Sequence, residues 1–401
     1  MSTIPFSTLR VIYPHQSQRG FTLIELMVSM VLGLIILLAV LTLFVNVNRN
    51  NSEFNKTSIL IENGRFAVQL LESDLIHAGF WGGHIPEFDN LTEADEPTDV
   101  PTAVPDPCLT YNVTNWDAAY KTNLLGIAIQ PYDAATVCSS LLPDILANTD
   151  VLVVRHANTC IPGEANCEAN ISGNLYFQKS NCNDDPPTDA SPYIFNTTGH
   201  TLHDRDCTTV AGLRKFISNI YYIRDYAVTS GDGIPTLMRA EFDLAGGTLA
   251  HQAAVPLIEG IEGFQIELGI DNWSKSGDPL YDSTIMPDSP LPAPYDAYDD
   301  EVEWTDDTNK TTPENRGDGA ADGDFVHCTT AVPCTVEQLM NVVAIRVHVL
   351  ARALEPTQGY TDAKTYSLGS TNLGPFNDQF KRHTFSSTVR LYNISGRRET
   401  P

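Results

Sequence analysis

The chain has 401 residues, a hydrophobic fraction of 42% and a formal net charge of −26 at pH 7. This length and apolar content allow a substantial core, which excludes a chain that is disordered throughout. Fifty acidic residues against 24 basic ones repel phosphate backbones, which argues against direct nucleic-acid binding by the body as a whole. We read the acid surplus as keeping an exported protein soluble, in preference to cation binding.

The N-terminus contains one long apolar segment. Residues 1–20 include Arg10 and Arg19 and no acid, and residues 21–45 follow with Glu25 as their single charge. As a helix, this segment is about 37 Å long at the usual rise, enough to cross a hydrocarbon core of roughly 30 Å. Because the basic residues precede it, we expect a cytoplasmic N-terminus and an exported body.

An ordinary secretory signal has a small-residue cleavage site after its apolar run, and none is found here. The small residue in a processing-like context is Gly20, which precedes the run. Cleavage after Gly20 would remove the basic leader and leave the whole apolar helix on the mature protein.

Glu25 is unusual inside such a segment. A carboxylate at the centre of a membrane helix costs about 2.5–3.5 kcal/mol, and less toward the interface. After cleavage at Gly20, the new amine of Phe21 lies one helical turn from Glu25, so the amine of a neighbouring subunit can pair with this carboxylate. The alternative is an interfacial Glu25 that faces lipid headgroups.

The segment Arg19-Gly20-Phe21-Thr22-Leu23-Ile24-Glu25-Leu26 resembles the class III leader of type IV pilins and type II secretion pseudopilins. This resemblance implies that a prepilin peptidase cuts between Gly20 and Phe21 and methylates the Phe21 amine. It also implies that Glu25 is the assembly residue.

The helix is expected to continue beyond the membrane, over residues 22–78, because no proline occurs between Phe21 and Ile85. Its second half shows apolar positions at three- and four-residue spacing, which predicts an amphipathic helix that lies against a sheet. The stripe consists of Leu60, Gly64, Ala67, Leu71, Leu75 and Ala78, widened by Ile59, Phe66 and Leu70, with Glu62, Arg65, Glu72 and Asp74 on the polar side.

The rest of the chain is rich in predicted β-strands, so we expect an α+β fold in which the long helix packs on antiparallel sheets. Strands are expected at 150–156, 215–228, 235–245, 261–271, 342–353 and 383–394. Ser230-Gly231-Asp232-Gly233 predicts a hairpin between the second and third of them. The last three alternate as half-buried strands. Residues 84–107 and 271–324 are expected as long acidic loops.

Several later segments resemble the PilW family of minor pilins. They are Asn63-Gly64-Arg65-Phe66-Ala67, Asp74-Leu75, Ala78-Gly79-Phe80-Trp81-Gly82, Tyr221-Tyr222-Ile223-Arg224, residues 257–264 and residues 386–393. The resemblance implies a subunit that primes a type IV pilus and sits at its tip. It implies as partners other minor pilins, the major pilin and a pilus-tip adhesin, with prepilin peptidase for processing. Residues 271–324 have no counterpart in this resemblance.

All eight cysteines follow the membrane segment, and none forms a C-x-x-C pair. An even number in a loop-rich, exported region predicts disulfides in an oxidising compartment. Eight cysteines allow 105 pairings. Closeness in sequence favours two of the pairs, Cys160 with Cys167 and Cys328 with Cys334.

Two clusters contain residue types that can bind a metal ion. Asp318, Asp322 and Asp324 are a weak Ca²⁺ candidate, because their spacing is not that of an EF-hand. Residues 271–324 carry 15 acids and three bases, and self-repulsion favours an extended segment there over an ordered calcium loop. A zinc role for His200 and His203 is less favoured than a solvated loop.

We therefore predict a structural protein without a cofactor. Its parts are a leader at 1–20, a transmembrane and assembly helix at 21–45, an amphipathic continuation at 46–80, and a periplasmic β-rich domain at 81–401. The alternatives are a minor pseudopilin of a type II secretion system and a membrane-anchored periplasmic enzyme. Catalytic motifs such as H-E-x-x-H and G-x-S-x-G do not occur in the sequence.

Overall fold

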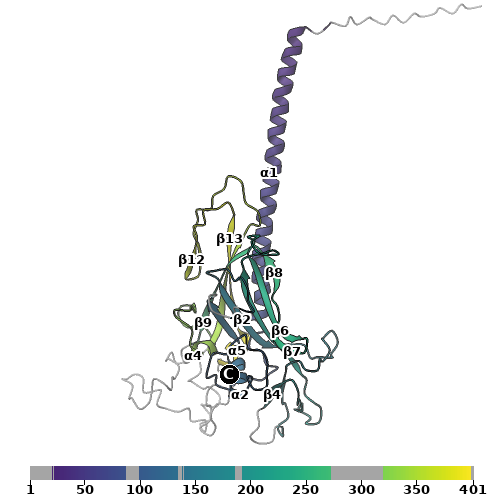
Figure 1. The fold of residues 1–401 in the computed structure, drawn as a ribbon, viewed down its shortest axis with the longest axis vertical. Helices are drawn as coiled ribbons and strands as arrows, with labels where there is room; N and C mark the ends of the chain where they lie inside the picture. The colour runs from purple at the N-terminus through teal and green to yellow at the C-terminus, as the bar shows by residue number, and fades with distance from the viewer. Residues whose placement is uncertain are drawn as a thin grey trace, which may run out of the picture. The chain divides into compact units, whose positions relative to one another are not determined.

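The computed structural model describes residues 20, 22–86, 99–133, 138, 140–185, 192–271 and 319–398. The chain divides into two compact units, Met1–Asn55 and Lys56–Pro401. One long helix, α1 (Leu23–Leu75), contributes its first part to the first unit and its last 20 residues to the second (Figure 1). Its bounds lie within three residues of the predicted 22–78.

The second unit contains an eight-stranded antiparallel sheet and a three-stranded one (Figure 1). The larger sheet has the order β1-β2-β5-β3-β4, with β6 pairing β5, β7 and β8. Its strands are β1 (Ile129–Asp133), β2 (Asp150–Ala157), β3 (Tyr176–Lys179), β4 (Tyr193–Asn196), β5 (Arg214–Arg224), β6 (Thr236–Ala245), β7 (Thr248–His251) and β8 (Val255–Glu259).

The smaller sheet has the order β13-β10-β9. It consists of β9 (Ile261–Ile270), β10 (Val342–Arg352) and β13 (Arg382–Arg390), while β11 (Tyr366–Leu368) and β12 (Thr371–Leu373) form a separate pair. The short helices are α2 (Ala118–Gly126), α4 (Val336–Met340) and α5 (Tyr392–Arg398). The α+β architecture with a long N-terminal helix and antiparallel sheets is confirmed.

The main core lies between α1 and both sheets. The predicted stripe of Leu60, Gly64, Ala67, Leu71, Leu75 and Ala78 is buried. Its apolar side chains share one cluster with residues of both sheets, among them Leu152 of β2, Phe264 of β9 and Val347 of β10. Packing of both sheets on one apolar stripe fixes this part of the helix to the body.

Two residues that were expected to widen the stripe lie outside the core. Ile59 is 45% exposed and Phe66 is 53% exposed, whereas Leu70 packs against the core as predicted. The two exposed positions are seven residues apart on one side of the helix, beyond the arc that the sheets cover. Periodicity identified the centre of the stripe correctly and overestimated its width.

The predicted hairpin is present, since β5 and β6 are antiparallel neighbours. Asp232 holds the connection through its carboxylate, which accepts backbone N–H bonds from Ala227, Val228, Thr229 and Ile234. Gly231 and Gly233 take positive φ angles of 89° and 69° there, which glycine adopts without strain.

Two other expectations are corrected, and a third falls largely on residues that the structure does not describe. Strands β9 and β10 are buried on both faces rather than half-buried, because other segments cover their second face. Leu350 of β10 shares a cluster with Tyr366 and Leu368 of β11, and Gly269 of β9 lies against Phe325. The last strand ends at Arg390, and Tyr392 begins α5 instead of continuing the strand to 394. Within the two expected acidic loops, residues 87–98 and 272–318 lie outside the described residues.

Four disulfides link the body. The pairs Cys160–Cys167 and Cys328–Cys334 are those suggested by sequence closeness, and Cys108–Cys138 and Cys182–Cys207 complete the set. No free cysteine remains, so the sulfur atoms are unavailable as metal ligands in this state.

Candidate assembly site

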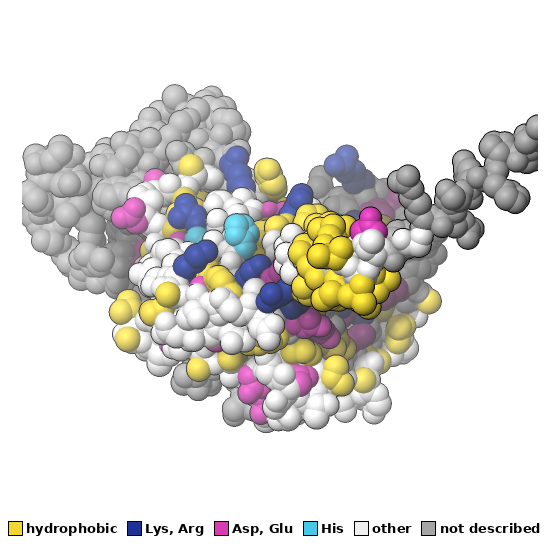
Figure 2. Space-filling view, turned by 90° about the horizontal axis from the view of Figure 1, so that it is seen from above, with side chains coloured by type: hydrophobic (Ala, Val, Ile, Leu, Met, Phe, Trp, Pro, Cys, Tyr) yellow, Lys and Arg dark blue, Asp and Glu magenta, His cyan; other side chains and the backbone are white. Residues whose placement is uncertain are grey.

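The first part of α1 buries none of its apolar side chains within the described chain. Its large apolar residues from Leu23 to Val47 are between 47% and 78% exposed. By length and composition this helix can cross a membrane. Figure 2 shows the helix end as a continuous apolar surface with one acidic side chain. A helix that is apolar on all sides is stable when lipid or other apolar helices surround it.

Glu25 is the single charge between Leu23 and Asn48, and it lies in the first turn of α1. Its carboxylate accepts hydrogen bonds from the Thr22 backbone N–H at 3.0 Å and from the Thr22 hydroxyl at 2.9 Å. The Glu25 N–H in turn donates to the Thr22 hydroxyl at 3.3 Å. These reciprocal bonds form a capping box that begins the helix.

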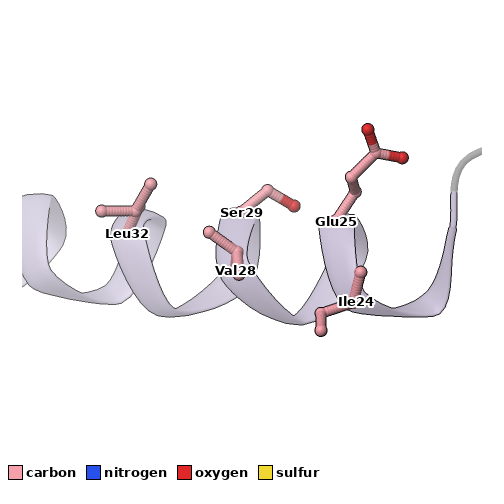
Figure 3. A pocket seen from close by; sticks show the side chains of 5 residues that line it. All are labelled: Ile24, Glu25, Val28, Ser29 and Leu32. Atoms are coloured by element: carbon pink, nitrogen blue, oxygen red, sulfur yellow. The ribbon is translucent and has the colours of Figure 1, made fainter.

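The capping box was missed by the sequence reasoning, although Thr-x-x-Glu at positions 22–25 is its standard signal. It gives Glu25 a partner inside its own chain. Figure 3 shows Glu25 on the same side of the helix as Ser29, with Ile24 and Val28 beside them. A carboxylate therefore stands next to the helix start on an otherwise apolar surface.

Gly20 and Phe21 lie immediately before this turn. Gly20 is exposed and outside regular secondary structure, and a Cβ placed on it would contact no neighbour within 4 Å. An exposed, non-helical backbone at this position is accessible to a peptidase. Phe21, whose amine is expected to pair with Glu25, lies outside the described residues.

The second part of α1 is held to the body by a carboxylate whose side chain is only 13% exposed, that of Asp74. It accepts hydrogen bonds from His156 at 3.0 Å, Asn219 at 3.0 Å and Tyr221 at 2.9 Å, all on β2 and β5. Burial alone raises the pKa of Asp74, but these bonds outweigh it and hold the pKa below its usual range. Asp74 was expected on the solvent side of the helix, and this expectation is wrong.

Further contacts tie the same helix segment to the sheets. Asn63 donates its side-chain amide to the backbone carbonyl of Glu259 at 3.0 Å. Asn393 donates to the carbonyl of Ala78 at 3.1 Å, beyond the end of α1. Gly64 passes directly against the ring of Phe385 on β13. The segments that resembled the PilW family are thus largely those that dock α1.

The metal candidates gain no support. Asp318 lies outside the described residues, and Asp322 donates its backbone N–H to Ile270. Among the described residues, the two clusters close enough to hold an ion each contain a pair of disulfide-bonded cysteines. His203 bonds to Asp185, and His200 contacts the carbonyl of Asn196.

Comparisons with known proteins give one family match for the N-terminal segment and another for the body. Residues 15–41 match the family model of the prokaryotic N-terminal methylation motif. Residues 220–393 match the model of type IV pilus-assembly protein W, PilW. A search of curated proteins found no match.

Among solved structures, a type IV-like pilin from Thermus thermophilus is similar at 12% sequence identity. The similarity covers 67% of this chain and 83% of that chain, with a TM-score of 0.25.

Proposed function

We propose that this chain, a type IV pilin-like protein whose residues 220–393 match the PilW model, is a minor pilin that primes assembly of a type IV pilus and sits at its tip. The observation that supports this proposal most directly is the exposed apolar stretch of α1 between Leu23 and Asn48, in which Glu25 is the single charge. Such a helix is stored in a bilayer and can later exchange its lipid contacts for those of neighbouring helices.

The chemistry of assembly then follows from the first residues. Prepilin peptidase removes residues 1–20 and leaves Phe21 as the new N-terminus, whose amine is methylated. In the growing filament, this amine pairs with Glu25 of a neighbouring subunit, or with Glu25 of its own chain in place of Thr22. Either exchange keeps the carboxylate satisfied in an apolar environment, where an unpaired charge is costly.

The size of the body favours a tip position. A unit of residues 56–401 with inserted loops packs poorly at the short repeat of a fibre, whereas a tip position tolerates its bulk. The arginines of the leader favour a cytoplasmic N-terminus, and four disulfides favour an oxidising periplasm for the body. The proposed partners are other minor pilins, the major pilin and a tip adhesin, and the proposed role is structural rather than catalytic.

The test replaces Glu25 in the full chain, in cells that assemble pili. We expect Glu25→Ala to be cleaved after Gly20 and retained in the membrane, yet to fall by about tenfold or more in the sheared pilus fraction, since an ion pair in an apolar environment is lost. Immunoblots of both fractions and mass spectrometry of the N-terminus measure these outcomes.

Two neighbouring variants serve as controls. Ser29→Ala removes a polar group one turn away and should assemble normally. Thr22→Ala breaks the capping box but leaves the carboxylate, so it should assemble far better than Glu25→Ala. Equal defects in Thr22→Ala and Glu25→Ala would assign Glu25 to helix capping alone. A mature N-terminus beyond residue 45 would contradict the proposal altogether.

A further inference from the structure

The two edges of the three-stranded sheet differ. At the β9 edge, Leu268 and Val326 exchange backbone hydrogen bonds of 2.7 and 2.8 Å, and Asp322 donates its N–H to Ile270. The N–H of Ile266 donates to the carboxylate of Asp150. This edge is therefore closed by the chain itself, as natural sheets require.

The β13 edge has no such cover among the described residues. Its strand pairs with β10 over nine residues without a register shift. No backbone hydrogen bond joins residues 383–389 to a described segment other than β10. The sequence of these residues, His-Thr-Phe-Ser-Ser-Thr-Val, contains no proline, lysine or acid. Charges, prolines and bulges are the usual devices that protect an edge. This edge has Arg382 and Arg390 at its two ends and none of these devices between them.

The ladder determines which groups point outward. Leu391 donates its N–H to Val343, so residues at odd positions of β13 bond to β10. In an antiparallel ladder the alternate residues direct their N–H and C=O groups away from the partner strand. These residues are Thr384, Ser386 and Thr388. Ser386 and Thr388 are exposed, and Thr384 is half-buried.

Apolar side chains of α1 lie on the same side of the helix as its contacts with β13. Gly64 packs on Phe385, and the carboxylate of Glu72 accepts a hydrogen bond from the Ser387 hydroxyl. Ile61 precedes Gly64 by three residues and Ile76 follows Glu72 by four, so both lie on this side. They are 40% and 43% exposed.

We propose that an extended segment of a neighbouring, non-identical pilin subunit pairs with β13 through the backbone of Thr384, Ser386 and Thr388. Along the partner segment, side chains point alternately to the two faces of the sheet, and those on the α1 side are apolar and contact Ile61 and Ile76. A second copy of this chain is disfavoured, since each copy carries a formal charge of −26. The inference rests on the proposed function, which supplies pilin subunits as neighbours. Strand addition of this kind takes its affinity from main-chain hydrogen bonds.

The test compares two substitutions at one position in the full chain. Ser386→Pro removes an outward N–H and leaves the bonds to β10 intact, because proline is tolerated where the N–H faces away from the sheet. Ser386→Ala keeps the backbone donor. We expect Ser386→Pro to fall by about tenfold or more in the sheared pilus fraction, since the ladder to the partner is interrupted. Ser386→Ala should stay within about twofold of wild type.

Equal incorporation of both variants would overturn the β13 inference while leaving the proposed function standing. Absence of the wild-type chain from the pilus fraction would overturn both. Hydrogen exchange of the detergent-solubilised wild-type chain provides a readout that needs no variant. The Ser386 and Thr388 amides should exchange freely in the isolated chain and become protected when pilin complexes extracted from the same cells are added. Protection already in the isolated chain, or equal protection by added copies of this chain, would refute the inference.

Discussion

At the scale of single residues, the body depends on buried polar side chains that join distant segments. Asp74 is the clearest case, because its side chain is 13% exposed and three donors from β2 and β5 satisfy it. Removing the charge leaves those donors facing an uncharged acceptor, and a buried group without its full set of partners costs free energy. Apolar contacts alone would allow α1 to rotate about its axis, whereas the directional hydrogen bonds to Asp74 fix that rotation relative to β2 and β5.

We expect Asp74→Asn to lower the free energy of unfolding at pH 7 by about 3 kcal/mol, since charge-assisted bonds to a buried carboxylate are lost. The pKa of Asp74 is held below its usual range, so this contribution is present above about pH 4 and is lost as the pH falls through the folded-state pKa. The difference between the variants should therefore shrink in acid. Urea unfolding of the full chain in detergent at several pH values measures it.

Glu62→Gln is the matched control, because Glu62 lies on the exposed face of the same helix. It should leave the unfolding free energy unchanged at all these pH values. A comparable loss in both variants would mean that helix charge, rather than the Asp74 network, determines the stability.

At the scale of elements, the sequence predicted the middle of the buried face of α1 better than the width of that face. The spacing of Leu60, Ala67 and Leu71 identified the buried face of α1, because a 3.6-residue period follows directly from helix geometry. It misplaced Phe66 and Ile59, because periodicity does not tell how far a sheet wraps around a helix. Asp74 was also misplaced, since a carboxylate reads as solvent-facing until its partners on other strands are known.

The close contact between α1 and β13 also could not be predicted from the sequence. A glycine in mid-helix lowers helix propensity, so the sequence alone gives no reason for Gly64. The fold supplies it, because a Cβ at this position would lie within 2.7 Å of three carbon atoms of the Phe385 ring. Two elements more than 300 residues apart in sequence fix the identity of this residue together.

We expect Gly64→Ala to destabilise the body by up to about 2 kcal/mol, because overpacking costs about 1–3 kcal/mol and the gain in helix propensity offsets about 1 kcal/mol of it. Phe385→Leu removes part of the ring, so the double variant should lose less stability than the sum of the single ones. Gly396→Ala in α5 meets no atom within 4 Å and should be neutral or slightly stabilising. Additive losses in the double variant would exclude steric overlap as the cause.

At the scale of the whole molecule, the disulfides all lie within the second unit, between Cys108 and Cys334. Sequence closeness suggested the two short loops. The pairs Cys108–Cys138 and Cys182–Cys207 span 30 and 25 residues, and their partners follow from the fold rather than from spacing. These two cross-links therefore close the longer loops, for which the loop-closure entropy is larger.

This distribution predicts an order of effects when each bridge is removed by a double Cys→Ala substitution. In the chain-entropy account, the bridges Cys108–Cys138 and Cys182–Cys207 contribute about 3–4 kcal/mol each, and the two short loops about 2–3 kcal/mol each. Thermal unfolding of the four double variants under oxidising conditions should rank the long bridges above Cys160–Cys167 and Cys328–Cys334. Under a reductant that opens all four bridges, the variants should converge with the wild type. A ranking in which the short bridges dominate would show that local geometry, and not closure of long loops, is what the disulfides contribute to this body.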